Sequence, residues 1–266
     1  MLRSLYSGIS GLRSFQTKLD VVANNIANVN TYGFKASRTT FADLMSQTLV
    51  GAAQPEDNRG GANAVQIGLG VRVASTDLLM TQGSLQFTGV TLDLAVDGNG
   101  FFAVEKEGER LLTRSGNFYL DANGNVVTAG GAFLLDVNGN RIQIPPDAES
   151  FSVDLGGTVR AVVGGAVQEV ATIGLIWVPN PQGLEKVGDN MYRLTPNATP
   201  NPAVLDLGAP GTGGRGLVRS GYLEMSNVDL AQEFTEMIIA QRGFQANARI
   251  TTTSDEVLQE LVNLKR

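Results

Sequence analysis

The two ends of the chain carry the same spacing of apolar residues, and this repetition limits how the sequence can fold. Near the N-terminus the spacing alternates between four and three residues, at Leu5, Ile9, Leu12, Gln16, Leu19, Ala23 and Ile26. Near the C-terminus it recurs at Leu230, Phe234, Met237, Gln241, Phe244 and Ala248, weakens at Thr251 and Asp255, and recovers at Leu258 and Val262. Such spacing places apolar side chains along one side of a helix and is typical of helices that pair. We therefore predict a long helix at each end.

Two kinds of partner could cover these apolar stripes. Each helix could lie on the core of its own domain, or the two helices could pair, within one subunit or between subunits. Gly8 and Gly11 each cost about 1 kcal/mol relative to Ala in a helix, so the first helix should need a partner. Residues 1–42 carry a net charge of +4 and residues 222–266 a net charge of −3. Opposite charges favour pairing of the two helices, although two solvated faces that differ by chance would give the same pattern.

Between the ends the pattern changes to short apolar runs and tight turns. Runs such as LDLAV (92–96) and FFAV (101–104) are separated by Gly- and Asn-rich turns, for example DGNG (97–100). This combination is typical of β-hairpins, and it predicts mostly antiparallel β structure for residues 83–223.

These segments together predict an α+β protein. Its long N- and C-terminal helices would pair as a coiled-coil-like core, with a mainly antiparallel β domain between them. The expected parts are an N-terminal helical segment of an inner core domain (1–45), an irregular or extended connection (46–82), a β-rich outer domain (83–223) and a C-terminal helical segment of the inner domain (224–266).

The residue types exclude most catalytic chemistry. The chain has no cysteine and no histidine, which excludes disulfides, zinc–thiolate sites, thiol nucleophiles and Ser-His-Asp triads. A net charge of −6 argues against a nucleic-acid partner. We expect no enzyme activity, no cofactor, no metal site and no small-molecule substrate.

Three short motifs resemble functional sites but fit turns better. DANGN (121–125) and DVNGN (136–140) begin like calcium loops, yet glycine falls at position four rather than six. GTGGRG (211–216) matches a nucleotide-binding pattern without a preceding strand or a βαβ unit. A secreted carbohydrate-binding or hydrolytic β module remains as a distant alternative. Its candidate carboxylates would be Asp93, Asp97 and Glu105.

The stretch ANNIANVNTYGFK (23–35) crowds four asparagines around the end of the first predicted helix. One interpretation is that Asn24, Asn25 and Asn28 hydrogen-bond across subunits and set their register, because buried polar groups specify register at some expense in stability. The other is local: the amides satisfy backbone groups at one helix end. Gly33 would then supply a positive φ, and Phe34 would anchor the chain on a neighbouring layer.

This stretch strongly resembles the N-terminal signature of the bacterial flagellar rod and hook protein family. Further blocks resemble that family over nearly the whole chain: LDLAVDGNGFF (92–102), TRSGNFYLDANGNVVTAGG (113–131), SGYLEMSNVDLAQEF (220–234) and MIIAQRGFQANARITTTSDEVLQELVNLKR (237–266). The last block most resembles hook proteins of the short type.

The resemblance implies a structural subunit that polymerises into the hollow helical tube of the flagellar hook or basal body. Expected partners are other copies of the chain, adjoining rod and hook–filament junction proteins, the hook cap and the export apparatus. Export would proceed through the flagellum-specific type III pathway without signal cleavage. The start, MLRSLYSGISGL, lacks the apolar stretch and cleavage site of a secretory signal.

The resemblance favours the hook, where the tube transmits motor torque to the filament. The distal rod is the alternative, because the connection at 46–64 is of a kind found in distal-rod proteins and in some hook proteins.

The predicted subunit-interface residues combine both apolar stripes with the asparagine-rich stretch. They are Leu5, Ile9, Leu12, Leu19, Asn24, Asn25, Ile26, Asn28, Gly33, Phe34, Leu230, Phe234, Met237, Phe244, Leu258 and Val262.

Overall fold

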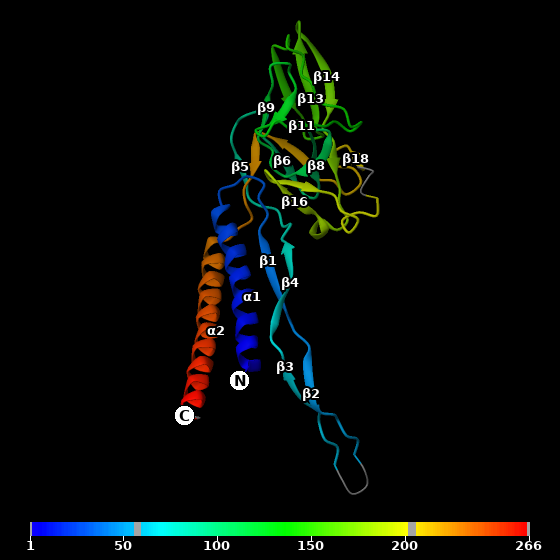
Figure 1. Ribbon diagram of the computed structural model, residues 1–266. Coiled ribbons are helices and arrows are strands. Elements are labelled where there is room, and N and C mark those ends of the chain that lie inside the picture. The colour runs from blue at the N-terminus through cyan, green and yellow to red at the C-terminus, as the bar shows by residue number, and fades with distance from the viewer. Residues whose placement is uncertain (1, 56–59, 202–205, 265–266) are drawn as a thin grey trace. The chain divides into compact units, whose positions relative to one another are not determined.

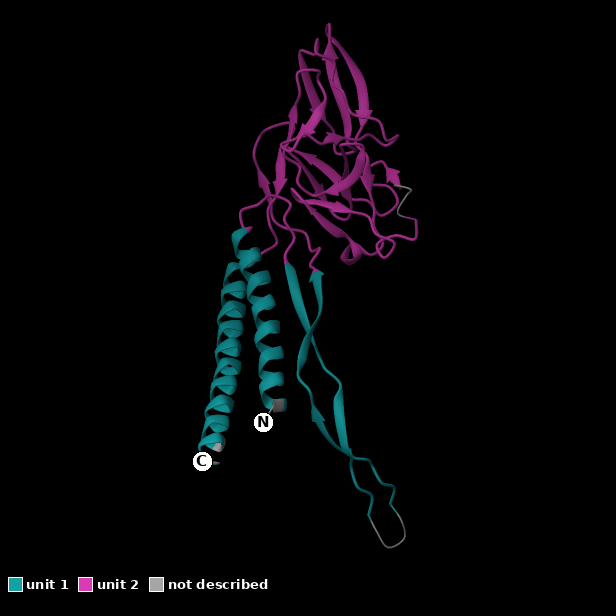
Figure 2. Ribbon diagram, viewed as in Figure 1, with its two compact units in different colours: residues 1–27, 37–77, 229–266 teal, residues 28–36, 78–228 magenta. Residues whose placement is uncertain are grey.

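The computed structural model describes residues 2–55, 60–201 and 206–264. Its helices and strands (Figure 1) group into two compact units, which Figure 2 colours separately. Unit 1 comprises residues 1–27, 37–77 and 229–266, and unit 2 comprises residues 28–36 and 78–228. The four parts expected from the sequence follow one another along the chain, whereas these two units interleave along it.

Unit 1 contains the two terminal helices, α1 (Leu2–Ala27) and α2 (Leu230–Leu264). They run antiparallel and contact each other along their lengths (Figure 1). α2 begins at an N-cap, because Asp229 Oδ1 accepts hydrogen bonds from the amides of Ala231 (2.9 Å) and Gln232 (3.4 Å).

The TTTS run at 251–254 does not interrupt α2. Its hydroxyl groups hydrogen-bond to carbonyls one turn back, as Thr253 Oγ1 does with Arg249 (2.9 Å) and Ser254 Oγ with Ile250 (2.7 Å). These bonds keep the polar side chains inside the helical pattern, so the last segment is one helix.

A long two-stranded ribbon completes unit 1. β1 (Ser37–Asp43) pairs with β4 (Val71–Leu78), and β2 (Ser46–Val50) pairs antiparallel with β3 (Val65–Gly68). The connection expected to be irregular or extended (46–82) contains these extended strands, whose arms satisfy each other's backbone groups. The ribbon also packs on α1, where the rings of Phe15 and Phe41 lie 5.7 Å apart.

Unit 2 consists of β-sheets and short connections. The strands of its largest sheet run in the order β16 (Glu185–Gly188), β17 (Met191–Arg193), β8 (Glu109–Thr113), β7 (Phe101–Lys106), β11 (Phe133–Leu134), β10 (Val126–Thr128) and β9 (Phe118–Leu120), with β15 (Leu175–Ile176) joining β7 to β18 (Leu207–Gly208). Smaller sheets are β12 (Ser150–Val153), β13 (Thr158–Val163) and β14 (Ala166–Thr172); β6 (Leu94–Asp97) with β19 (Leu217–Ser220); and β5 (Leu85–Phe87) with β20 (Tyr222–Glu224). One 3₁₀ turn spans Pro181–Gly183.

The predicted combination of terminal helices with mainly antiparallel β structure is confirmed. Among the described residues of unit 2, the paired strands all run antiparallel to each other.

The two calcium-like motifs are turns. In the second, Asp136 Oδ1 accepts hydrogen bonds from the amides of Asn138 (2.8 Å) and Asn140 (2.7 Å), so it holds the turn closed. In the first, Gly124 has φ +79°, and a Cβ there would lie 2.1 Å from the carbonyl oxygen of Ile144. Only glycine fits that position.

Unit 2 has a buried apolar core. Phe102 and Phe118 meet edge to face at its centre, with ring centroids 5.4 Å apart. Phe102 is fully buried and Phe118 is 2% exposed. Aromatic pairs of this geometry add to the stabilisation from their buried area.

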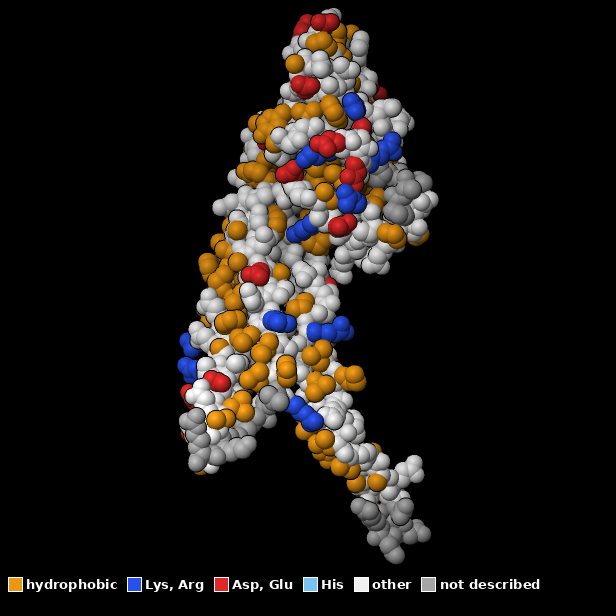
Figure 3. Space-filling view, in the orientation of Figure 1, with side chains coloured by type: hydrophobic (Ala, Val, Ile, Leu, Met, Phe, Trp, Pro, Cys, Tyr) orange, Lys and Arg blue, Asp and Glu red, His pale blue; other side chains and the backbone are white. Residues whose placement is uncertain are grey.

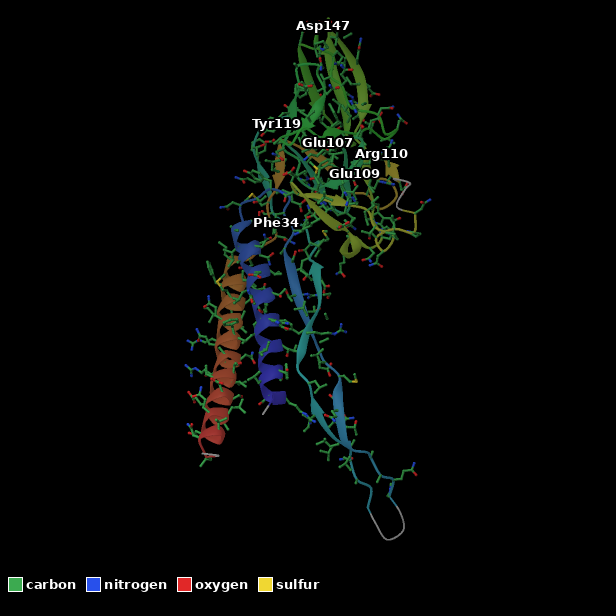
Figure 4. The ribbon with its side chains drawn as sticks, in the orientation of Figure 1. Phe34, Glu107, Glu109, Arg110, Tyr119 and Asp147 are labelled. Atoms are coloured by element: carbon green, nitrogen blue, oxygen red, sulfur yellow. The ribbon has the colours of Figure 1, made fainter. Side chains whose placement is uncertain are left out.

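Neighbouring aromatics on β9 provide a matched test of this core. Phe118→Ala should destabilise unit 2 by about 3–5 kcal/mol, because it removes a buried ring and leaves a cavity. Tyr119 (Figure 4) is 55% exposed, so Tyr119→Ala should change the free energy of unfolding by no more than about 0.5 kcal/mol. Urea unfolding measures both, and equal losses would contradict this view of the core.

Candidate assembly surface

Small residues lie at the contact between α1 and α2. Gly8 and Gly11 are buried, and so is Ala240 on α2. A Cβ on Gly243 would lie 2.5 Å from the ring of Phe15. The glycines thus allow the helices to approach closely. From the sequence pattern alone, these glycines indicated only a cost to helix stability.

The predicted apolar stripes lie beside this contact rather than within it. On α1 the buried positions are Gly8, Gly11, Ser14, Val22 and Asn25. The predicted residues Leu5, Ile9, Leu12, Leu19 and Ile26 are only half-buried. On α2, Leu230, Phe234, Phe244 and Val262 are exposed, and Met237 and Leu258 are half-buried. The contact within the subunit therefore leaves much of both stripes open.

Further apolar residues of unit 1 are exposed that the sequence analysis did not select. They are Ile238, Ile239, Ile250, Val257 and Leu264 on α2, and Met45, Leu49, Val50, Val65 and Ile67 on the ribbon. Figure 3 shows hydrophobic side chains along the helices and the ribbon on the face in view. The alternation Val65, Ile67, Leu69, Val71, Val73 was the signal that could have identified the ribbon.

Asn25 uses its amide group within the subunit. Its Oδ1 accepts a hydrogen bond from the amide of Ser37 (3.0 Å), and its Nδ2 donates to the Ser37 carbonyl (2.8 Å) and to Glu233 Oε1 (3.1 Å). The side chain is 1% exposed. Asn25 therefore joins α1, β1 and α2, and we leave it out of the assembly surface.

Asn24 and Asn28 differ from Asn25 in their exposure. Asn24 is exposed and Asn28 is half-buried. Asn28 closes a turn after the helix, where its carbonyl accepts from the amide of Thr31 (3.1 Å) and its Oδ1 accepts from Thr31 Oγ1 (3.1 Å). These contacts of Asn28 fit the local interpretation, and a role between subunits remains a prediction for both residues.

The end of the asparagine-rich stretch belongs to unit 2. Gly33 has the predicted positive φ, +68°, and its amide donates to the Glu224 carbonyl (2.8 Å). Phe34 (Figure 4) is 5% exposed and lies under the ammonium group of Lys186, 4.5 Å from the ring centroid. Because Phe34 is buried in its own unit, it offers little surface to a neighbouring layer, and we leave it out of the assembly surface.

A buried ion cluster fixes this stretch. Glu224 Oε1 accepts from Lys35 Nζ (2.6 Å) and from the Gly83 amide (2.9 Å), while Oε2 accepts from Arg114 (3.2 Å). Burial lowers the pKa of the Lys35 ammonium, and the charge of Glu224 opposes this effect. Since burial disfavours an unpaired charge, Glu224 is the group on which the cluster depends.

Charged groups also link the two helices. Lys18 and Glu236 form an ion pair of 2.6 Å between α1 and α2. This pair joins a cation of the basic N-terminal segment to a carboxylate of the acidic C-terminal segment, as the opposite charges of the two chain ends predicted. Burial raises the pKa of the nearby Glu233 carboxyl, and the hydrogen bond from Asn25 opposes that shift.

Three family models match the chain. They are "Flagella basal body rod protein" over residues 5–35, "Flagellar hook protein FlgE/F/G D1 domain" over 95–161 and "Flagellar basal body rod FlgEFG protein C-terminal" over 219–264. The matches include α1, part of unit 2 and α2.

Relatives match over the whole length. The flagellar basal-body rod protein FlgG of Bacillus subtilis (strain 168) is 53% identical, with 100% of both chains covered. The chain belongs to the flagellar rod and hook protein family. The rod protein FlgG of Buchnera aphidicola subsp. Schizaphis graminum is 38% identical, covering 99% of this chain and 100% of its own. The hook protein FlgE of Borreliella burgdorferi is 29% identical in an alignment of 446 positions, again covering 100% of both chains.

Membership of the rod and hook family confirms the resemblance found in the sequence. The chain is a structural protein of the flagellum and not an enzyme. In the described part of this family member, neither helix is long and apolar enough to cross a membrane.

The close approach of α1 and α2 can be tested by substituting alanine at two glycines, one where a Cβ would clash with the other helix and one where it would fit. Gly243→Ala should lower the thermal midpoint for loss of helical circular dichroism, because its Cβ would clash with Phe15. Gly8→Ala is the control. Its Cβ would meet the nearest atom at 3.4 Å, so the gain in helix propensity of about 1 kcal/mol should raise the midpoint. A rise of similar size in both variants would contradict close packing at Gly243.

The buried ion cluster predicts an asymmetry between two Glu→Gln substitutions. Glu224→Gln leaves two buried cations without a counter-charge and should destabilise unit 2 by about 3–5 kcal/mol. Glu109 (Figure 4) pairs with Arg193 at the surface, where its side chain is 48% exposed. Glu109→Gln should leave the urea midpoint nearly unchanged, because solvent screens exposed ion pairs. A small effect of Glu224→Gln would show that the cluster contributes little.

Proposed function

We propose that the chain is a subunit of the distal flagellar rod. The observation that supports this most is full-length identity of 53% to a rod protein, against 29% to a hook protein. The resemblance of the C-terminal block favoured the hook. That block lies in the match to the FlgEFG C-terminal model, which names the hook protein FlgE as well as rod proteins, so it separates the two less well than identity over the whole chain.

The size of the molecule also favours the rod. The hook relative aligns over 446 positions with a chain of 266 residues, so it carries long insertions that this chain lacks. The rod relatives align over about the length of this chain, 267 and 268 positions. The length of this chain therefore fits the rod relatives better than the hook relative.

In this proposal the subunits form a hollow helical tube through unit 1. The small-residue contact holds α1 against α2 within one subunit. The exposed stripe containing Leu230, Phe234 and Val262 then packs on the half-buried stripe of α1 in a neighbouring copy, giving the coiled-coil-like core. One repeating contact of this heterologous kind does not close on itself and so produces a helical polymer. Apolar side chains that stay exposed along one helix, such as those of Leu230, Phe234 and Val262, are typical of interaction surfaces.

The proposed partners follow from the position of a distal rod. They are other copies of the chain, adjoining rod proteins, the hook and the export apparatus. Direct contact with the hook–filament junction proteins and the hook cap was expected of a hook subunit, and the rod proposal does not require it.

Electron microscopy of the purified polymer separates rod from hook. A distal-rod subunit should form straight, rigid tubes. Curved tubes that change curvature with solution conditions would favour the hook instead, and a protein that never polymerises and binds glycans would favour a β module.

The assembly surface predicts an effect on polymerisation with little effect on the subunit. Phe234 is 52% exposed, and burying such a ring against a neighbour contributes about 1.5–3 kcal/mol. Phe234→Ser should raise the critical concentration for polymerisation at least about tenfold. The control is Tyr119→Ser, which alters a ring of similar exposure in unit 2 and should polymerise as the wild type does. Sedimentation of the polymer measures both.

Unchanged polymerisation of Phe234→Ser would remove this part of α2 from the proposed contact. Urea unfolding of the free variants checks that the subunit itself is intact.

A further inference from the structure

Two cations are buried next to one carboxylate in unit 2. The side chains of Lys35 and Arg114 are 1% and 5% exposed, and that of Glu224 is fully buried. Among the residues that the structure describes, Glu224 is the carboxylate that forms an ion pair with either of them. With Lys35 protonated, the cluster therefore carries one positive charge in excess.

The hydrogen bonds of Arg114 show a vacant donor. Its two terminal nitrogens donate to Glu224, to the Val96 carbonyl (3.3 Å) and to the Gly98 carbonyl (2.7 Å). Its Nε is buried and has no hydrogen-bond partner. Buried donors are almost always satisfied, so a missing partner of this kind needs an explanation.

A cavity adjoins both cations. Its volume is about 220 Å³, and it is lined by residues that include Lys35, Asn99, Phe101, Arg114 and Trp177. This is far more than the roughly 10–15 Å³ that one water molecule needs. None of its lining residues is acidic. The DGNG turn (97–100) supplies one wall, so a motif first noted as a turn also shapes the cavity.

We propose that this cavity binds one oxyanion of carboxylate size. An anion there would neutralise the excess charge of the cluster and offer acceptor oxygens to the cationic wall. Charge-assisted hydrogen bonds of this type are about twice as strong as neutral ones. The carboxylate could be an acidic side chain of another copy of the chain or a free small carboxylate, and the chemistry of recognition is the same.

The competing way to remove the excess charge is loss of the Lys35 proton. Burial lowers the pKa of Lys35, whereas its contact with Glu224 raises it. If Lys35 were neutral, Arg114 and Glu224 would balance and the cavity would have little affinity for an anion. Measured anion binding therefore decides between the two.

The single tryptophan of the chain gives a direct readout. Trp177 lines the cavity and is 40% exposed. Sodium acetate, titrated into the full-length subunit at constant chloride and ionic strength, should produce a saturable change in Trp177 fluorescence. In an NMR titration, the chemical-shift changes of the Trp177 indole N–H and the Gly100 amide should be among the largest in the protein. No saturable change, or largest shifts at surface arginines such as Arg193, would overturn the proposal.

A pair of variants assigns the effect to the cluster. Lys35→Gln removes the excess charge and should weaken acetate binding at least tenfold. Arg193→Gln removes an exposed cation that pairs with Glu109 and should bind acetate as the wild type does. Equal affinity in Lys35→Gln and wild type would overturn the proposal. If Lys35→Gln does not fold, the NMR titration of the wild type decides alone.

The assembled polymer distinguishes the two sources, and this comparison alone rests on the proposed function. A fluorescence response present in the free subunit and absent from the polymer would assign the carboxylate to a neighbouring copy. A response retained in the polymer would assign it to a free anion. Failure to polymerise would count against the proposed function and leave the measurements on the free subunit valid.

Discussion

Three passages of the chain are held together in unit 2 by polar contacts, and the rest of the unit depends on them. Lys35 bonds to Glu224, and the amide of Ala36 donates to Asn227 Oδ1 (2.8 Å). The amide of Leu79 donates to the Ala36 carbonyl (2.8 Å), and Asn227 Nδ2 donates to the Leu79 carbonyl (2.8 Å). These passages are the places where the chain enters and leaves the unit. The partners in these contacts lie far apart in sequence, so the contacts form only when both ends of the unit's chain are in place.

Much of the secondary structure could be predicted from sequence periodicity. The four-three spacing identified α1 and α2, and the alternating runs with Gly-rich turns identified the antiparallel sheets. Periodicity could not show which side of each helix meets the other. The decisive residues there are Gly8, Gly11 and Gly243, whose contribution is the absence of a side chain. A pattern of apolar residues does not reveal such a contact, because glycine has no apolar side chain to count and has a low helix propensity.

The polar contacts were the least predictable part. Nothing in the sequence pairs Asn25 with Ser37, or Lys35 with Glu224, because these partners meet only after the chain has folded. The same is true of Phe34, an aromatic residue that could equally serve an interface or a core. The pairing of the ribbon strands was unpredictable for another reason: the Pro/Gly/Asn-rich stretch at 46–64 is typical of an irregular connection, and the apolar alternation from Val65 to Val73 does not show which segment it pairs with. In the structure β3 ends at Gly68 and β4 begins at Val71, so Gly70 lies in the short link between these two strands.

The two helices of unit 1 differ in length, 26 residues in α1 against 35 in α2. In their antiparallel register, Gly8 lies by Thr251, so the last residues of α2 extend beyond the start of α1 by roughly 10 Å at about 1.5 Å per residue. Apolar residues in this overhang are exposed: the exposed fraction is 65% for Val262 and 83% for Leu264. A neighbouring copy that packs on these residues would be staggered along the helix axis relative to the first. In the proposed polymer, the unequal helices would give each subunit two different ends, and with them a direction in which the next copy is added.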